Sequence, residues 1–212
     1  MQAEPFDKHC RRCPRLASHL DAVRQGYPRY HAAPVPGFGP IGSRLLVVGL
    51  APGMHGANRT GRPFTGDYAG VLLYDTLHRY GFANQPNGDA ADDGLQLLGA
   101  RVTNAVRCLP PENKPVGAEV RTCNAFLIHE LQAVPEGGVI LALGRIAHDA
   151  VLLAFGERRS AHAFGHAAEH AVGGHVLLDS YHCSRYNTQT RRLTPDMFQA
   201  VFARARQICG TR

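Results

Sequence analysis

Four cysteines stand in the sequence at a spacing typical of metal ligands. Cys10 and Cys13 are separated by two residues, and Cys108 and Cys123 are separated by fourteen. Thiolates in such a pattern hold either an iron–sulfur cluster or a zinc ion, and the spacing alone does not distinguish the two. The early pair and the later pair are therefore predicted to meet at one metal site.

The two remaining cysteines, Cys183 and Cys209, have no partner in this pattern and are expected to pack as small apolar residues. An even total of six cysteines would also suit disulfides. However, the sequence shows no signal-peptide stretch and no apolar run of the ~18 residues that a membrane span needs. We therefore expect a soluble, cytoplasmic protein in a reducing compartment, where clustered cysteines hold metals.

Three further segments are unusually dense in glycine, proline and polar side chains. They are residues 49–67, 103–108 and 180–190. Each follows a short apolar run that is predicted to be a buried strand. Because ligands bind at the carboxyl ends of parallel strands, the three segments are expected to converge on one site.

The strands that position these segments follow from the hydrophobic pattern. Apolar, β-branched runs predict four strands, at residues 44–50, 101–107, 138–143 and 175–180. Helical periodicity follows each of them. The alternation predicts an α/β fold, a three-layer αβα sandwich around a central four-stranded parallel sheet. With 212 residues and 44% apolar content, the chain is expected to form a single domain over residues 1–212.

Helix boundaries can also be predicted. The first helix is expected over Val71–His78, with Gly81 as its stop signal, and apolar stripes predict helices over residues 116–131 and 146–155. Thr194, followed by proline and aspartate, is typical of the start of a last helix. Loops are predicted at residues 84–94 and 158–174.

These motifs, in this order, resemble the uracil-DNA glycosylase superfamily and, within it, the iron–sulfur-containing family-five (UDGb) type. The resemblance rests mainly on the long motif from Gly49 to Gly53 and from Asn58 to Asp67, and it extends from Cys10 to the helix after Thr194. It implies a uracil-DNA glycosylase-like fold. It also implies a DNA-repair enzyme that flips uracil out of duplex DNA and hydrolyses its N-glycosidic bond, leaving an abasic site.

The resemblance further assigns a cofactor and a substrate range. It implies that the four cysteines of the first pattern hold a structural [4Fe–4S] cluster. It also implies activity on other deaminated or modified bases, hypoxanthine included. No lysine stands in any of the three motifs to form a Schiff base, so the enzyme is expected to be monofunctional.

Two residues are implied to hold the flipped base. Phe64 resembles the ring that stacks on the base, and Asn104 resembles the amide that reads the uracil edge. A phenylalanine in a loop of glycine, proline and arginine has little core to join, which favours stacking. Each residue has an ordinary alternative, because Phe64 could belong to the core and Asn104 could satisfy a strand end.

Cleavage of the glycosidic bond makes the sugar cationic while the base departs with negative charge. The enzyme must therefore stabilise both the positive charge on the sugar and the negative charge on the base. The resemblance implies that His182 donates a hydrogen bond to the departing carbonyl. Backbone amides of the turn that contains Ala51, Gly53 and Met54 are expected to add donors, and these three residues are assigned to the substrate site. A lone histidine is more often structural, which is the alternative for His182.

The carboxylate that supports the sugar and orients water is harder to assign. Leu50 stands where other branches of the superfamily carry a polar or acidic residue. Asp67 matches the candidate catalytic carboxylate of family-five relatives. It also occupies a helix-cap position, which by itself would explain an aspartate.

The segment after His182 resembles the loop that enters the minor groove when a base flips. Six of its residues are candidate DNA contacts: Arg185, Tyr186, Asn187, Arg191, Arg192 and Leu193. Either Tyr186 or Leu193 is expected to act as the apolar wedge. Arg191 stands where relatives commonly carry glycine, so a positive φ at this position would add strain of about 1 kcal/mol or more.

The charge of the chain is compatible with these assignments. The formal charge is +6, and nearly all of the positive charge is arginine, which pairs well with phosphate. A basic, solvated surface without a nucleic-acid partner would have the same composition. The expected partner is double-stranded DNA with a flipped damaged base, bound by a monomer. Two other classes remain open, a redox protein that uses the cluster directly and a nucleic-acid-binding module without catalysis.

Overall fold

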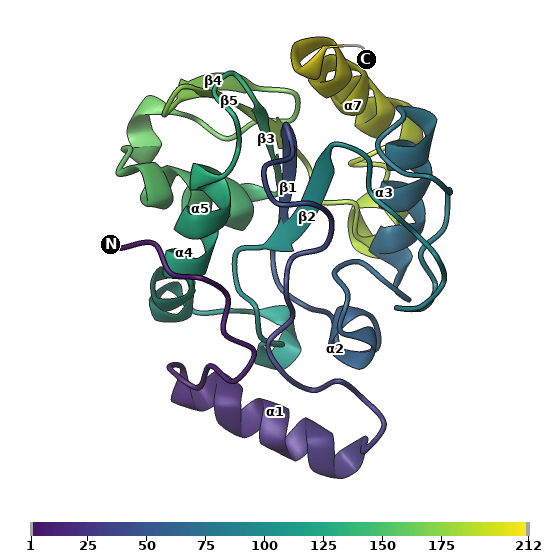
Figure 1. Ribbon diagram of the computed structural model, residues 1–212, viewed down its shortest axis with the longest axis vertical. Helices are drawn as coiled ribbons and strands as arrows, with labels where there is room; N and C mark the ends of the chain where they lie inside the picture. The colour runs from purple at the N-terminus through teal and green to yellow at the C-terminus, as the bar shows by residue number, and fades with distance from the viewer. Residues whose placement is uncertain (1, 211–212) are drawn as a thin grey trace.

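The computed structural model describes residues 2–210, and its centre is a five-stranded sheet in the order β2-β1-β3-β5-β4 (Figure 1). The strands are β1 (Leu45–Gly49), β2 (Ala100–Asn104), β3 (Val139–Leu143), β4 (Glu169–Val172) and β5 (His175–Ser180). β1, β2, β3 and β5 are parallel, whereas β4 pairs antiparallel with β5 at the edge. The four predicted strands are confirmed as strands, and the sheet has one strand more than predicted.

The additional strand, β4, lies in the segment that was predicted to be a loop, so that prediction is wrong for residues 169–172. Only Val172 of its four residues is buried, so no apolar run marks this edge strand in the sequence. The sequence signal that could have located β4 is the glycine pair in the turn that follows it. Gly173 and Gly174 have φ values of +56° and +81°, and a two-residue hairpin loop with two positive φ angles connects antiparallel strands directly.

Helices cover both faces of the sheet. The helices are α1 (Pro14–Gly26), α2 (Ala57–Thr60), α3 (Tyr68–Arg79), α4 (Gly117–Gln132), α5 (Arg145–Phe155), α6 (Arg185–Gln189) and α7 (Pro195–Cys209). α3 and α7 share one apolar core with Leu45 and Val47 of β1, and α4 and α5 share the other with Leu46 and Val48. Successive side chains of a strand point to opposite faces, so β1 contributes alternately to the two cores.

The predicted helices are present, and the predicted caps form. Thr194 precedes α7, and its side chain accepts a hydrogen bond from Met197 N at 3.2 Å. α1 was not predicted, although its buried residues Leu16, Leu20 and Val23 recur at helical spacing. This helix lies outside the sheet layers, at the lower end of Figure 1, and packs against Val106, Leu109 and the start of α4. Within residues 2–210, none of the helices combines the length and the apolar character of a membrane span.

Candidate functional site

A cavity of about 530 Å³ lies at the carboxyl ends of the parallel strands, and this is a size typical of small-ligand pockets. The segments that follow β1, β2, β3 and β5 all contribute to its wall, so the polar segments converge as predicted. The lining is apolar with a few polar side chains. It consists of Leu50, Ala51, Gly53, Ala57, Phe64, Asp67, Ala69, Asn104, Asn113, Leu143, Gly144, Arg145, Ile146, His182 and Ser184.

Phe64 and Asn104 meet over the last residue of β1, Gly49. A Cβ atom at Gly49 would lie 2.5 Å from both Phe64 Cζ and Asn104 Oδ1, so only glycine allows both side chains to approach each other here. Phe64 packs at the edge of the core beneath α3 and also lines the cavity. The core and the stacking interpretations of this ring are therefore compatible.

The amide of Asn104 has an unsatisfied acceptor. The residue is 3% exposed, and its Oδ1 atom is buried without a hydrogen-bond partner among the described residues. A buried acceptor without a partner costs about 1–3 kcal/mol. A ligand in the cavity that carries an N–H group would remove this cost.

The loop that carries Phe64 is held in an unusual backbone conformation. Phe64 has a φ of +53°, and α3 approaches its carbonyl so closely that a Cβ atom at Gly70 would overlap the carbonyl oxygen. Tyr74 of α3 donates a hydrogen bond to Pro63 O at 2.5 Å. Such a conformation in a non-glycine residue persists only where its surroundings fix it, and it is typical of functional sites.

A buried ion pair fixes the same loop from the other side. Arg62 donates two hydrogen bonds to the carboxylate of Asp93, at 2.8 and 2.7 Å, and a third to Thr65 Oγ1 at 2.7 Å. Arg62 holds the pKa of Asp93 well below its usual range. The sequence analysis assigned no role to either residue, because Asp93 lies in a polar loop 31 positions away from its partner.

Asp67 is both a helix cap and part of the cavity wall. Its Oδ1 atom accepts a hydrogen bond from Gly70 N at 2.9 Å, which confirms the predicted cap of α3. Its Oδ2 atom lies beside the turn after β1, where a Cβ atom at Gly56 would be 2.5 Å away. Burial raises the pKa of Asp67, and hydrogen bonds from the Gly70 and Ala69 N–H groups oppose this shift.

His182 follows β5 and is half-buried in the cavity wall. Burial lowers its pKa to about 4, so the ring is neutral near pH 7 and donates through one nitrogen only. The rings of His182 and Phe64 have centroids 6.0 Å apart and planes inclined by 25°. The backbone carbonyl of His182 accepts a hydrogen bond from Asn187 Nδ2 at 2.8 Å, which holds the turn that carries the ring.

The predicted substrate residues after β1 divide into two groups. Ala51 and Gly53 line the cavity, together with Leu50. Met54 does not line the cavity. It borders an adjoining groove, and it also packs against an apolar cluster that contains Leu20 and Val23 of α1 and the loop residue Ala32.

The predicted DNA-contacting segment is partly exposed. Tyr186 is 71% exposed, and the guanidinium of the exposed Arg185 lies 5.2 Å from the ring centroid of Tyr68. Arg192 is also exposed and stacks on Tyr181 at 4.6 Å. Arg191 has a φ of +56°, so the positive φ considered at this position in the sequence analysis is present.

The position of Leu193 contradicts the prediction that this residue contacts DNA or acts as the wedge. The residue is 0% exposed and belongs to the core between the sheet, α3 and α7. A side chain in this position cannot act as a wedge unless the loop refolds. Of the two wedge candidates, only Tyr186 presents its side chain to solvent.

Four of the cysteines gather as the spacing predicted. Cys10, Cys13, Cys108 and Cys123 all line one small apolar cavity between the N-terminal segment, the turn after β2 and α4. None of them forms a disulfide. Cys183 is fully buried in the main core, which agrees with its predicted packing role.

The chemistry of this sulfur set fits a polynuclear cluster. Four cysteine sulfurs around one small cavity are the ligand set that a [4Fe–4S] cluster requires, and the same set would also hold a zinc ion. Burial and the charges of the neighbouring cysteines raise the pKa of Cys108 to about 12. Burial also raises the pKa of Cys123, to about 11. Cys108 and Cys123 are therefore neutral thiols near pH 7, and a bound cation would be needed to convert them into thiolate ligands.

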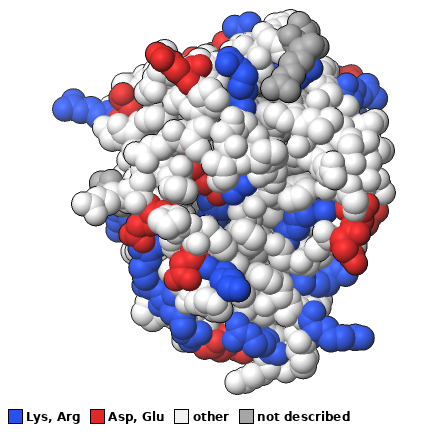
Figure 2. All heavy atoms as spheres, viewed as in Figure 1, with Lys and Arg blue, Asp and Glu red and all other residues white. Residues whose placement is uncertain are grey.

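Basic side chains are numerous, and on the face drawn in Figure 2 they do not form one continuous patch. Figure 2 shows them mainly over the lower part of this face, around α1, with acidic side chains between them. Several of these arginines are paired, for example Arg11 with Asp21 at 2.6 Å and Arg15 with Glu119 at 2.8 Å. Part of the positive charge therefore stabilises the protein itself.

Comparison with known proteins shows which family the chain resembles. The family model of the uracil DNA glycosylase superfamily matches residues 36–206. The chain is 50% identical over 208 residues to a Type-5 uracil-DNA glycosylase of Thermus thermophilus, which covers 95% of this chain and 94% of the relative. A Type-5 uracil-DNA glycosylase of Pyrobaculum aerophilum is 40% identical over 206 residues, with 95% and 90% covered. One of Mycobacterium tuberculosis is 43% identical over 210 residues, with 95% and 78% covered.

Proposed function

The chain belongs to the uracil-DNA glycosylase superfamily, and on this premise we propose that it hydrolyses the N-glycosidic bond of uracil in DNA and leaves an abasic site. It acts in DNA repair, on a base that is flipped out of the duplex into the cavity. The observation that carries the proposal is the buried Asn104 Oδ1, which has no partner among the described residues and lies at the cavity beside the ring of Phe64.

Base recognition follows from the chemistry of these two side chains. Uracil presents an N–H donor next to a carbonyl acceptor, and the amide of Asn104 offers the complementary acceptor and donor on one plane. Cytosine presents an acceptor and an amino donor in these positions. With the amide in the same orientation, its oxygen would face the acceptor and its NH₂ group would face the amino donor, so both contacts would be repulsive. The ring of Phe64 provides a stacking surface, and such stacking contributes roughly 1–3 kcal/mol per base.

His182 is assigned to donate a hydrogen bond to the departing base. Its ring is neutral near pH 7 because burial lowers its pKa to about 4, and a neutral N–H group can donate to the oxygen on which negative charge develops. Backbone amides of Ala51 and Gly53, which line the same cavity, are placed to add donors. A pocket without a polar side chain at Leu50 also leaves room for other deaminated bases, hypoxanthine among them.

Asp67 serves the sugar. One carboxylate oxygen is engaged in the helix cap, and the other lies beside Gly56 and, farther away, beside Gly53 of the cavity wall. Because burial removes part of its solvation, the carboxylate interacts more strongly with a developing positive charge than it would in water. It is therefore assigned to stabilise the cationic sugar and to orient the attacking water.

The four gathered cysteines would hold a [4Fe–4S] cluster, whose role is structural. It would cross-link the N-terminal segment to the turn after β2 and to α4. Iron and sulfide near four per chain are expected, and stoichiometric zinc after anaerobic preparation would contradict the assignment. Cys10→Ala should lower the soluble fraction before it lowers the catalytic constants, because it frees the N-terminal segment.

The DNA duplex is proposed to lie over the exposed segment after His182. Arg185 and Arg192 are placed to pair with phosphates, and Tyr186 is the wedge candidate that remains exposed. Binding should weaken steeply as salt concentration rises, because each neutralised phosphate releases about one counterion.

The direct test is an alkali strand-cleavage assay on a uracil-containing duplex. Heating in alkali cleaves the strand at an abasic site, so cleavage at the uracil demonstrates glycosylase activity. The same assay over a panel of modified bases defines the substrate range. Binding without cleavage at any base would favour a non-catalytic nucleic-acid-binding protein.

A further inference from the structure

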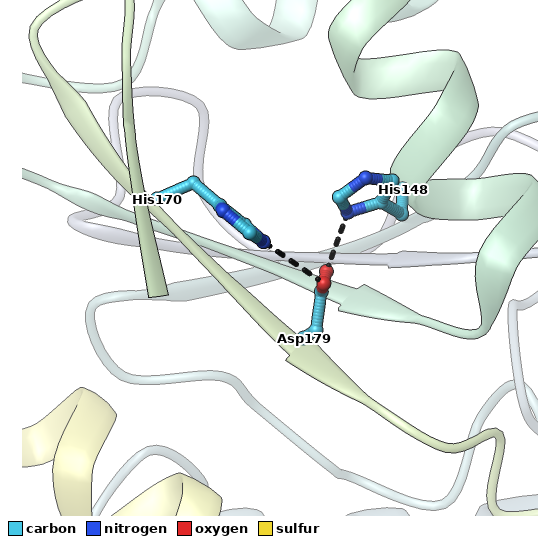
Figure 3. A group of neighbouring side chains, drawn as sticks. All are labelled: His148, His170 and Asp179. Atoms are coloured by element: carbon cyan, nitrogen blue, oxygen red, sulfur yellow. Dashed lines mark hydrogen bonds and ion pairs between the residues drawn. The ribbon is translucent and has the colours of Figure 1, made fainter. Parts of the chain in front are cut away.

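A second group of metal-ligating side chains lies away from both the cavity and the cysteines (Figure 3). It consists of His148 from α5, His170 from β4 and Asp179 from β5, whose ligand atoms all lie within 4.8 Å of one another. None of the three lines the cavity described above. We propose that these residues form a binding site for one divalent transition-metal ion of the Zn²⁺ type.

The first step of the argument is the charge of Asp179. This carboxylate is 0% exposed, and no arginine or lysine pairs with it among the described residues. Its polar neighbours are His148 Nδ1 at 2.8 Å, His170 Nε2 at 3.3 Å and the backbone N–H of Gly165 at 3.4 Å. A wholly buried carboxylate needs a positive charge close to it. A positive charge must therefore reside within this group. Burial lowers the pKa of His148, but the hydrogen bond and the charge of Asp179 outweigh this and raise it, so a proton on His148 or a bound metal ion can supply that charge.

The second step is the orientation of His148. Its Nε2 atom lies 2.9 Å from the backbone carbonyl of His162, which can only accept, so Nε2 carries the hydrogen. Nδ1 then faces the carboxylate of Asp179 at 2.8 Å, and a positive charge is needed between the two atoms, either a proton on Nδ1 or a metal ion bound to it. Metal-binding histidines show this same arrangement, in which the second ring nitrogen donates to a backbone carbonyl.

The third step is the ligand set. Two imidazoles and one carboxylate are preferred by zinc and related first-row ions, and three protein ligands leave one position for water. Ligand atoms around tetrahedral zinc are about 3.3 Å apart when the bonds are about 2.0 Å long. His148 Nδ1 lies 2.8 Å from Oδ1 of Asp179, and His170 Nε2 lies 3.3 Å from its Oδ2. One ligand atom from each of the three residues lies within 4.8 Å of the other two, so side-chain shifts of about 1 Å would bring them to the spacing around zinc.

The surroundings give such an ion a route and further stabilisation. His170 lies on the edge strand and keeps 13% of its side chain exposed, so an ion can enter from that side. The ring of His162 lies 5.5 Å from that of His170 and approaches Glu157, and Asp149 of α5 pairs with Arg159 at 3.4 Å. Arg159 offsets the charge of Asp149, so among these described residues Glu157 is the carboxylate that adds negative potential near the site.

The consequence is structural. The ion would connect α5 to both strands of the β4–β5 hairpin, three residues before His182 on the same chain segment. It would stabilise the strand end that positions His182 without touching the base. The proposal does not depend on the activity proposed above, and its test does not measure that activity.

The experiment is a zinc titration of the holoprotein, followed by calorimetry and thermal unfolding, with the cluster monitored by its visible absorbance. One ion per chain is expected, with a rise in Tm of about 5–10 °C at a free zinc concentration on the order of 100 Kd. The zinc X-ray absorption spectrum should show nitrogen and oxygen neighbours at about 2.0–2.1 Å and no sulfur at about 2.3 Å.

Two variants make the result specific. His170→Ala should lower the zinc affinity at least about tenfold, whereas His78→Ala, on the exposed face of α3, should leave it unchanged. Equal zinc binding by the wild type and His170→Ala, or sulfur in the spectrum, would overturn the proposal. Absence of saturable binding would also overturn it and would indicate that a proton holds the group together. Should His170→Ala fail to fold, the spectrum of the wild type decides.

Discussion

One carboxylate oxygen of Asp67 accepts the Gly70 N–H at 2.9 Å and thereby caps α3, while the other lies against Gly56 in the turn after β1, and Asp67 itself lines the cavity. The helix cap therefore aims the carboxylate at the cavity. The two interpretations of Asp67 that the sequence allows, a cap and a catalytic group, describe the two oxygens of the same side chain. The residue that caps α3 is therefore the same residue that is assigned to catalysis.

The close contact between Gly56 and Asp67 gives the first prediction. In Gly56→Ala, the new Cβ atom would lie 2.5 Å from Asp67 Oδ2 and would push the carboxylate away. Uracil excision should fall by roughly 10²-fold, since a displacement of ~1 Å has effects of this size. Gly26→Ala is the matched control, because a Cβ atom there meets nothing within 4 Å. Equal excision rates in the two variants would contradict the placement of Asp67.

Substitution of Asn104 should lower the excision rate without lowering the stability of the protein. Asn104→Ala removes a buried oxygen that has no partner among the described residues, so the free energy of unfolding should stay constant or rise. Uracil excision should nevertheless drop by roughly 10² or more, because the base edge loses its partner. Denaturant unfolding and single-turnover excision measure the two effects. A large loss of stability with unchanged excision would indicate a purely structural asparagine.

The pKa of His182 predicts a dependence of stability on pH. The native pKa is about 4 against an ordinary value of 6.5, so between these values the unfolded chain binds more protons than the native protein. The contribution of His182 is complete above pH 6.5 and is lost as the pH falls toward 4. His182→Ala should therefore show a shallower loss of Tm over this range, whereas His78→Ala should follow the wild type. Identical slopes in wild type and His182→Ala would contradict the burial of a neutral ring.

Tyr186 and Leu193 should behave in opposite ways. Tyr186 is exposed, so Tyr186→Ala should leave Tm unchanged and reduce excision from duplex DNA more than from single strands, which need no wedge. Leu193 is fully buried, so Leu193→Ala should cost about 2–5 kcal/mol of stability. Melting curves and excision from both DNA forms check this. A stable Leu193→Ala variant with a duplex-specific defect would restore Leu193 as the wedge.

Much of the fold is predictable because its strands are buried on both faces. Every residue of β1 and β3 is buried, so each appears in the sequence as an uninterrupted apolar run. β4 could not be found in this way, since an exposed edge strand buries only Val172. α1 packs against α4 and the turn after β2 rather than on the sheet, so the alternation of strands and helices does not indicate it.

The site is predictable to the extent that its residues directly follow strands. Asn104 and His182 stand in short segments whose position is fixed by β2 and β5. By contrast, the burial of Leu193 depends on the fold of the segment through α6 and on the positive φ of Arg191, which spacing does not reveal. The pairing of Arg62 with Asp93 joins two loops and has no local signal in the sequence.

The most direct test of the account is single-turnover excision of uracil and of 5-fluorouracil by the wild type, Asp67→Asn and His182→Ala, with Tm as the folding control. Asparagine keeps a side chain competent to cap α3 but removes the charge, so Asp67→Asn should slow both bases by roughly 10² or more without unfolding. His182→Ala removes a donor to the departing oxygen, so its penalty should be smaller for 5-fluorouracil, whose leaving anion is more stable. Equal slowing of both bases by His182→Ala, together with unchanged rates in Asp67→Asn, would contradict the assignment of these residues to opposite ends of the breaking bond.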